Sequence, residues 1–220
     1  MVHCNNCTSD LNAWVNLFKE FADTFGMSVD MNELYGTLYR KALEGDADCG
    51  GLVSFNYFSG EPVTGFTEGR PMFVRKPDAK FNLANFMRTH ILSSLATIKI
   101  GNDILIKEEG VKVDCIMGHG GLFKTPVVGQ KLLAAALNTS VTVMDTASEG
   151  GPWGMAVLAA YMANKAEGET LSAYLNDKVF AGQTGSTLAP DVADVAGFDA
   201  FVENYKACFA AEHGAVDNWK

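Results

Sequence analysis

The amino-acid sequence predicts an α/β domain, because a strand, a glycine turn and a helix follow one another twice within residues 113–161. In the first unit, the apolar run 113–117 precedes Gly120 and Gly121, and apolar residues then recur at helical spacing over 127–136. Short apolar runs bounded by glycine are typical of buried strands, and a spacing near 3.6 residues is typical of helices. Thr125 and Pro126 predict the helix start, as an N-cap hydroxyl followed by proline at the first helical position.

The second unit repeats this order and completes a candidate binding site. A β-branched strand over 140–144 is followed by Gly150 and Gly151, and then by a helix that continues to Met162. Glycine lacks a Cβ, so its backbone can lie close to a ligand. The N-terminus of a helix offers free N–H groups and partial positive charge, which favour anionic or polar ligand atoms. The two glycine turns are therefore the predicted ligand site.

The preceding residues predict two amphipathic helices, two strands and one long helix. Apolar and aromatic residues from Leu11 to Phe25 fall on one helical stripe that Gly26 ends, and this stripe is expected to face the core. Asp30, with Glu33 three residues later, predicts a capping box for the second helix. Strands are expected over 50–58 and 69–74, and Asn82 is expected to cap a helix carrying apolar residues from Leu83 to Ile98.

The last part of the chain has a different composition. Residues 163–197 are rich in Gly, Asp, Ala and Thr, which predicts a short helix and an extended surface loop. Aromatic residues from Phe198 to Phe209 then mark a terminal helix. We expect a single domain over 1–220, with 163–220 as a C-terminal loop and helix extension.

Composition and charge exclude several classes of protein. Hydrophobic residues make up 48% of the 220 and charged residues 20%, as in globular proteins. The net charge of −9 argues against nucleic acid or an anionic membrane as the main partner. No secretory signal or spanning segment is visible, and the five scattered cysteines favour free thiols, so a cytoplasmic protein is expected. Cys4 and Cys7 form a C-x-x-C pair, which we interpret as two buried thiols at a helix entrance rather than a zinc or redox site.

Four segments occur in an order that is informative. They are Phe-Ser-Gly-Glu at 58–61, the strand and helix of 69–96, Gly-Gly-Leu-Phe-Lys-Thr-Pro leading to Gln over 120–130, and Glu-Gly-Gly-Pro-Trp-Gly-Met-Ala at 149–156. This series resembles the C-terminal domain of the FGGY carbohydrate kinases, most closely the xylulokinases and ribulokinases. Their corresponding motifs are Leu-Ser-Gly-Glu, a G-x-x-F-G-L strand with its helix, the adenosine motif G-G-G-A-K-S-P, and a closing E-x-x-A-L-G-A-A turn. The resemblance covers roughly residues 5–162.

The resemblance implies a ribonuclease H-like (actin-like ATPase) fold, with a mixed sheet flanked by helices. Two such domains close over ATP and a sugar, and this one would hold the adenosine. D-Xylulose is the favoured sugar and ribulose an alternative; Mg²⁺ is expected as a second cofactor, with ligands mainly in the N-terminal domain. The relatives also suggest a homodimer. Carried over by position, the residues that bind the nucleotide are Gly120, Gly121, Lys124, Thr125, Gly150 and Gly151.

The sequence departs from the family pattern at four positions. Arg75 replaces a glycine, Ser93 a glutamate and Leu122 the third glycine of the adenosine turn, while His119 stands where threonine is frequent. The first phosphate loop, the catalytic aspartate and the second phosphate turn of the family have no counterpart in this sequence. We therefore assign no catalytic residue and no metal ligand, and expect the rear half of a longer kinase, inactive by itself and partnered by an N-terminal kinase domain.

Two other interpretations of the glycine turns stay open at this point. One is an actin-like binding or assembly module that has lost its affinity for nucleotide, as the replacements at Arg75, Ser93 and Leu122 suggest. The other is a generic α/β domain, in which the glycines only let helices pack against strands.

Overall fold

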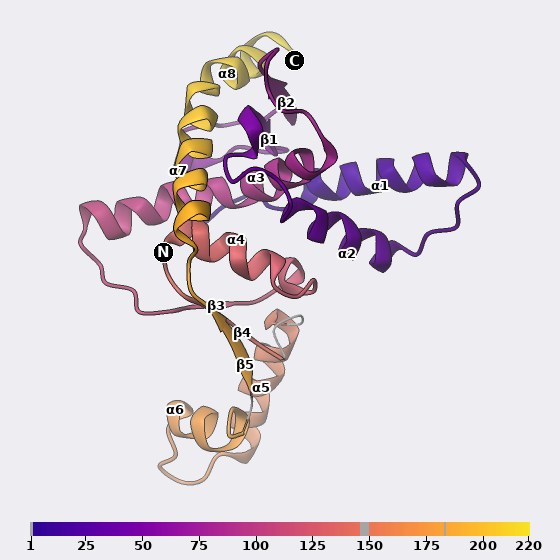
Figure 1. Ribbon diagram of the computed structural model, residues 1–220. Helices are drawn as coiled ribbons and strands as arrows, with labels where there is room; N and C mark the ends of the chain where they lie inside the picture. The colour runs from indigo at the N-terminus through magenta and orange to yellow at the C-terminus, as the bar shows by residue number, and fades with distance from the viewer. Residues whose placement is uncertain (1, 146–149, 183) are drawn as a thin grey trace.

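A computed structural model describes residues 2–145, 150–182 and 184–220 (Figure 1). In chain order the helices and strands are α1 (Ser9–Thr24), α2 (Met31–Ala42), β1 (Leu52–Phe55), β2 (Met72–Arg75), α3 (Leu83–Asp103), β3 (Ile116–Gly118), α4 (Val128–Leu137), β4 (Val141–Met144), α5 (Gly150–Asn164), α6 (Leu171–Tyr174), β5 (Gly185–Leu188), α7 (Val192–Ala207) and α8 (Phe209–Asn218). This order confirms the predicted α/β class. None of the described helices is both long and apolar enough to cross a lipid bilayer.

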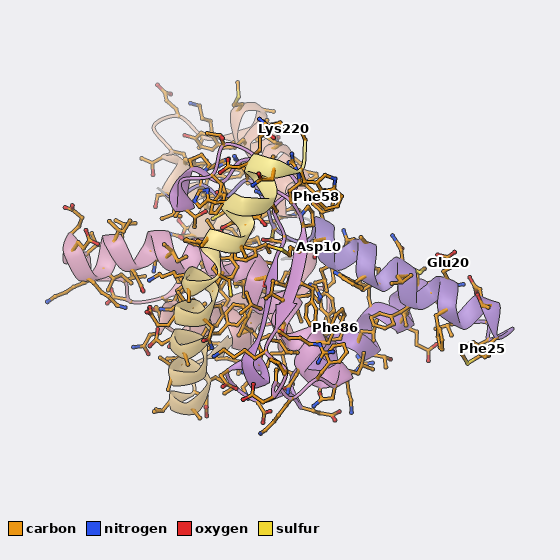
Figure 2. The ribbon with its side chains drawn as sticks, turned by 90° about the horizontal axis from the view of Figure 1, so that it is seen from above. Asp10, Glu20, Phe25, Phe58, Phe86 and Lys220 are labelled. Carbon is orange, nitrogen blue, oxygen red and sulfur yellow. The ribbon has the colours of Figure 1, made fainter. Side chains whose placement is uncertain are left out.

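The helices α1 and α2 form an arm that projects from the body (Figures 1 and 2). The Asp30 carboxylate accepts hydrogen bonds from the N–H groups of Asn32 and Glu33, which confirms Asp30 as the cap of α2. The expectation that the whole apolar stripe of α1 faces the core was wrong at its far end. Phe21 is 59% exposed and Phe25 67%, because the distal half of α1 extends beyond the body, with Phe25 at its tip (Figure 2).

The strands β1 and β2 form a small antiparallel sheet that packs on the buried helix α3. The Asn82 side chain accepts a hydrogen bond from the Asn85 N–H, so the predicted cap of α3 is confirmed. The Ser93 hydroxyl donates to the Ser54 carbonyl at 2.7 Å and ties α3 to β1. Because Ser93 is buried in this contact, its replacement of the family's glutamate affects the packing of the body.

The strands β3, β4 and β5 form the mixed sheet that the sequence predicted in outline. β3 runs parallel to β4, and β5 is antiparallel to β4 on its other side. The helix α4 packs against β4 and β5, and on α3 and α7 on its other sides. In Figure 1 this sheet lies below α4, with α5 and α6 toward the lower end of the molecule, and β1 and β2 lie above α3.

The segment 163–197 is more ordered than the predicted surface loop. It contains β5 and the first turns of α7, which begins at Val192 rather than at Phe198. The strand was missed because its Gly-Ser-Thr residues are polar and largely exposed, so it shows no apolar alternation. The helix start was missed although Asp191 caps it, accepting from the N–H groups of Ala193 and Asp194.

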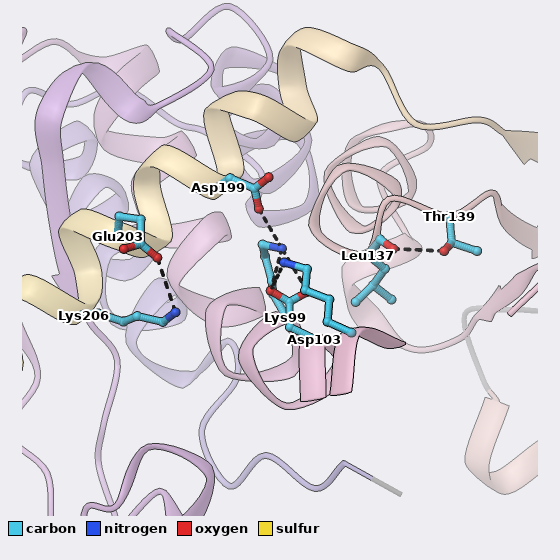
Figure 3. A network of polar contacts seen from close by, with 8 residues as sticks. Lys99, Asp103, Leu137, Thr139, Asp199, Glu203 and Lys206 are labelled. Carbon is cyan, nitrogen blue, oxygen red and sulfur yellow. Dashed lines mark hydrogen bonds and ion pairs between the residues drawn. The ribbon is translucent and has the colours of Figure 1, made fainter. Parts of the chain in front are cut away.

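The helix α7 belongs to the core, where it is held by apolar contacts and by charge. Its side chains Phe198, Phe201 and Tyr205 are fully buried. Lys99 of α3 is buried as well, and its ammonium lies 2.9 Å from a carboxylate oxygen of Asp199 on α7 (Figure 3). These contacts place α7 across the body beside α3 and α4.

The N-terminal residues lie along the loop that precedes the bend at Pro62. The backbone N–H groups of Asn5 and Asn6 both donate to Glu61 Oε2, at 3.0 and 3.1 Å. The interpretation of Cys4 and Cys7 as buried thiols was wrong for Cys7, which is exposed, while Cys4 is half-buried. Backbone N–H groups and the Glu61 carboxylate, rather than the thiols, make these hydrogen bonds, and Cys7 lies just before α1.

Candidate functional site

The first glycine turn begins directly after β3. Gly118 ends the strand, and a Cβ at this position would lie 2.6 Å from the ring of Phe123, so the ring requires glycine there. Gly120 has a φ of +110°, a region that side chains rarely tolerate. The carbonyl of Gly120 accepts from the Phe123 N–H, and that of Gly121 from the Lys124 N–H, both at 3.1 Å. The turn is therefore closed by its own backbone.

The outer face of this turn is open. An added Cβ at either Gly120 or Gly121 would meet no heavy atom within 4 Å. These glycines consequently serve no packing purpose within the described structure, unlike Gly118. A flat group can approach the backbone at both positions without displacing a side chain.

The helix after the turn starts later than predicted. Thr125 and Pro126 lie in the turn, and α4 begins at Val128 after Val127, which has a φ of +74°. The predicted cap was wrong because α4 is placed by a tertiary contact. A Cβ on Gly129 would lie 2.6 Å from the Leu122 carbonyl oxygen, so the helix is packed tightly onto the turn. The Thr125 hydroxyl is thus not used as a helix cap.

The second glycine turn lies against the first. A Cβ on Gly150 would come within 2.9 Å of the His119 Cβ, so the start of α5 touches the residue before Gly120. An added Cβ at Gly151 would meet nothing within 4 Å. Glu149, the first residue of the predicted closing motif, lies outside the described residues. The structure therefore brings the two predicted turns together.

A hollow of about 680 Å³ opens beside the first turn. Lys124 and Thr125 of the turn line it, together with Asp145 and Ser186. The same Lys124 and Thr125 also line a second hollow of about 440 Å³, together with Gly121 and residues of α1 and α2. Ligand sites have volumes of roughly 300–1,000 Å³, so both hollows have the size of a small-molecule site.

Three of the residues around the larger hollow were missed as site residues. Gln130 of α4 is buried, and its amide nitrogen donates to the carbonyls of Val141 and Ser186, both at 2.8 Å. Asp145 accepts a hydrogen bond from the Thr184 hydroxyl at 2.7 Å. Gln130 ended the predicted adenosine motif and could have been named from it. Asp145 and Ser186 could not have been named from the sequence, because the pairing of β4 with β5 brings them to the hollow.

The departures from the family pattern lie in different places. Arg75 is on the surface, with its guanidinium 4.7 Å above the Phe81 ring, and it lines neither hollow. Ser93 is buried against β1, as described above. Leu122 lies at the turn, where it lines the smaller hollow, and His119 lies directly before Gly120, against Gly150. Of the replacements at Arg75, Ser93 and Leu122, only the one at Leu122 lies in the lining of either hollow.

The described residues form no group of three or more His, Cys, Asp and Glu side chains that could hold a metal ion.

At the C-x-x-C pair, burial raises the pKa of the Cys4 thiol to about 11, with a further contribution from the charge of Glu61. This shift disfavours the thiolate that metal binding and redox exchange need.

A comparison with known protein families identifies the family of this chain. The sequence profile of the FGGY family of carbohydrate kinases, C-terminal domain, matches residues 1–163. The chain belongs to the FGGY family of carbohydrate kinases. No curated protein sequence gives a significant match.

Solved FGGY-type structures share the fold. The xylulose kinase from Rhodospirillum rubrum has a TM-score of 0.59 at 19% identity, with 82% of this chain and 34% of that chain covered. The gluconate kinase from Lactobacillus acidophilus gives 0.57 at 19%, with 80% and 35% covered. The Plasmodium falciparum glycerol kinase with ADP gives 0.59 at 13%, with 90% and 37% covered.

These likenesses confirm the predicted actin-like ATPase fold. At such identities they show the fold alone. The chain spans about a third of the length of the solved kinases.

Proposed function

We propose that this chain is the adenosine-binding C-terminal half of an ATP-dependent sugar kinase that phosphorylates a pentulose, with D-xylulose as the favoured substrate. The observation that carries the proposal is the open face of Gly120 and Gly121, together with a hollow of about 440 Å³ that Gly121, Lys124 and Thr125 line. Glycines that no packing requires, next to a hollow of ligand size, are the features that a flat nucleoside needs.

Each of these residues has a role that its position supports. The backbone of Gly120 and Gly121 would support the base or the ribose, and the Thr125 hydroxyl, which is not a helix cap, would bind a polar atom of the nucleoside. Lys124 carries positive charge and lines both hollows. The first N–H groups of a helix have no partner within the helix, so Gly150 and Gly151 at the start of α5 would offer theirs to a polar ligand atom.

The remaining functions belong to a companion N-terminal domain. ATP supplies the phosphoryl group when bound, and Mg²⁺ would be held mainly by that domain. Phosphoryl transfer requires groups that hold the β- and γ-phosphates and a residue that positions the attacking hydroxyl. This chain would contribute the orientation of the nucleotide, and we expect it to be inactive without the companion.

The choice of sugar is supported by the solved structures that share the fold. Xylulose kinases from Rhodospirillum rubrum and Bifidobacterium adolescentis are among the solved structures that share the fold, which favours D-xylulose. A gluconate kinase and a glycerol kinase share it to a similar degree, so D-ribulose and other polyols belong in the same assay.

Nucleotide binding tests the proposed site directly. Isothermal titration of the chain with ATP and with ADP should give weak binding, since half of the cleft wall is absent and its pre-organisation is lost. Gly121→Leu fills the open face without a clash and should weaken binding at least about tenfold, which corresponds to 1.4 kcal/mol. Gly214→Leu is the matched control, because Gly214 of α8 is equally open and lines neither hollow. Equal affinities for the two variants would contradict the assignment.

The kinase reaction needs the companion domain. The N-terminal portions of the solved xylulose kinases can be mixed with this chain and assayed for ATP-dependent phosphorylation of D-xylulose, D-ribulose, gluconate and glycerol. Activity toward a pentulose supports the proposal. A stable complex that phosphorylates none of these compounds would argue for a different substrate class or for loss of catalysis.

A binding or assembly module without chemistry is the second candidate. It is favoured by Leu122, whose side chain lines the smaller hollow where the family has a glycine. Under this hypothesis the folded chain binds neither ATP nor ADP, and Leu122→Gly restores binding. The same titration therefore separates the two candidates.

A further inference from the structure

The helix α1 carries one apolar stripe that runs from the body to the tip of the arm. Trp14, Phe18, Phe21 and Phe25 follow one another at spacings of four, three and four residues, so they lie on one face of the helix. Leu17, four residues before Phe21, lies beside them and is 51% exposed. The rings of Phe21 and Phe25 lie 4.9 Å apart and stay largely exposed. The outer half of the stripe is therefore apolar and open to solvent.

An apolar groove of about 320 Å³ lies at the inner end of the same stripe, between α1 and the start of α3. Its lining consists of Trp14, Phe18, Phe81, Asn82, Leu83 and Phe86. The rings of Trp14 and Phe86 meet edge to face, with centroids 4.9 Å apart. Phe81 is 54% exposed and Leu83 42%, so the groove is open to solvent although its lining is apolar.

The groove and the outer stripe form one surface, because Phe18 lines the groove and Phe21 follows it by one helical turn. We call it the arm surface and define it by its exposed side chains, which are Leu17, Phe21, Phe25, Phe81 and Leu83. Single exposed apolar residues are ordinary, but several that lie together indicate an interaction surface. Figure 2 shows its two ends, with Phe86 at the body and Phe25 at the tip of the arm.

The two ends of the arm surface carry opposite charge. Residues 19–33, at the outer end, contain four acidic residues and one basic residue. Residues 75–80, at the groove, contain three basic residues and one acidic residue. The Arg75 guanidinium lies 4.7 Å above the ring of Phe81, which places positive charge at the groove itself. The acidic tip argues against an anionic membrane as the partner, and it complements the basic groove of a second copy.

We propose that two copies of this chain associate through the arm surface, with their α1 helices antiparallel and a twofold axis beside Phe21. Phe25 of each copy then lies about 6 Å past the axis, opposite Leu17 of the other copy, and places its ring at the apolar groove. The acidic tip of each arm meets the basic end of the other groove. A twofold axis makes every contact twice, so one surface has to supply both the projecting rings and the groove that receives them. The arm surface supplies both.

Sedimentation equilibrium of the chain over a range of concentrations tests the association. Phe25→Asp should weaken the dimer at least about tenfold, because the apolar groove would have to receive a carboxylate. Met162→Asp is the matched control, because Met162 is 78% exposed on α5 and lies outside the arm surface. Neither residue is buried, so thermal unfolding at low protein concentration should show that both variants are folded.

Cross-linking tests the register. Phe21→Cys places two thiols beside the twofold axis and should give a disulfide-linked dimer under mild oxidation. Asp23→Cys is the control, since position 23 lies about 200° further around the helix and should not cross-link. Both variants also carry Cys7→Ser and Cys115→Ser, because these two native thiols are exposed.

Charge reversal tests the choice of a second copy as the partner. Arg75→Glu places like charges at the two ends of the arm surface and should weaken the dimer severalfold. Lys112→Glu makes the same change of charge at an exposed position outside the arm surface and should leave the dimer unchanged.

Four results would each overturn the proposal. The first is a chain that stays monomeric at the highest attainable concentration, and the second is equal weakening by Phe25→Asp and Met162→Asp, which would assign the contact to α5. The third is equal cross-linking at positions 21 and 23. The fourth is a monomeric chain whose binding to a companion kinase domain is lost in Phe25→Asp, which would assign the arm surface to that domain. None of these measurements involves nucleotide, so they stay separate from the test of the adenosine site.

Discussion

Replacing Arg88 with methionine should destabilise the protein by about 3 kcal/mol. The Arg88 side chain on α3 is 2% exposed, and one guanidinium nitrogen lies 2.6 Å from Asp194 Oδ1 on α7. Removing one partner of a buried ion pair costs about 3–5 kcal/mol, because the other charge stays buried without compensation. The pair connects the two helices that flank α4, so the effect reaches the helix that follows the glycine turn.

The lower end of this range applies, because Asp194 keeps a second cation. Lys131 Nζ lies 3.2 Å from Asp194 Oδ2, and its side chain is 39% exposed. For a domain of about this size, 1 kcal/mol shifts the melting temperature by about 2–4 °C. A loss of about 3 kcal/mol therefore corresponds to roughly 6–12 °C.

The pH dependence of the effect follows from the pKa of Asp194. Burial alone raises this pKa, but the hydrogen bond and charge of Arg88, followed by those of Lys131, outweigh burial and lower it below its ordinary value. A carboxylate with a lowered folded-state pKa stabilises the protein above the unfolded value of about 3.9, and this contribution is lost as the pH falls through the folded value. The difference between the parent and Arg88→Met should therefore shrink below about pH 4.

Urea and thermal unfolding of four proteins test this reasoning. They are the parent, Arg88→Met, the double variant Arg88→Met with Asp194→Asn, and Arg75→Met as a surface control. The double variant should recover most of the loss, since no charge is left buried. The control should change by less than about 1 kcal/mol, the scale of an exposed cation–π contact. A loss of under about 1 kcal/mol for Arg88→Met, or a double variant less stable than the single one, would refute the argument.

Two further predictions concern the sheet and the C-terminal helix. Gln130→Leu should lower the free energy of unfolding by about 1–3 kcal/mol. The reason is that the carbonyls of Val141 on β4 and Ser186 on β5 lose the amide group that donates to them. Hydrogen exchange over 185–188 should then accelerate, and unchanged exchange there would show that β5 does not depend on Gln130. Glu212→Gln tests a buried carboxyl whose pKa burial raises, so that its neutral form favours folding. Its contribution is present below the ordinary pKa of about 4.5 and is lost as the pH rises through the raised value. The parent should therefore lose stability relative to Glu212→Gln as the pH rises above about 4.5, and parallel pH profiles would contradict this.

Local signals in the sequence were reliable where a residue acts within its own segment. Asp30 and Asn82 cap their helices as predicted, because a side chain that accepts from N–H groups two or three residues away needs no distant partner. The glycine turn after β3 was recognised for a similar reason, since Gly120 occupies a backbone conformation that side chains avoid. The order of the matching segments then indicated the kinase family, which the family comparison shows.

Local signals failed where packing overrides the preference of the segment. Thr125 and Pro126 are a good helix start by propensity, yet α4 begins later because Gly129 packs against Leu122. Phe25 fits the apolar stripe of α1, yet that end of the helix extends past the body and leaves the ring exposed. In each case the sequence predicted the element and the tertiary structure decided its boundary or its burial.

The amino-acid sequence by itself determined the α/β class, the main helices and strands, and the two glycine turns, because periodicity and glycine content act over a few residues. Only the tertiary structure brought the turns together through Gly150 and His119, and only the pairing of β5 with β4 placed Ser186 beside the hollow. The apolar groove of the arm also depends on how α1 and the start of α3 meet in space. Contacts between residues far apart in the chain leave no periodic trace, so the shape of the site follows from packing rather than from any single segment.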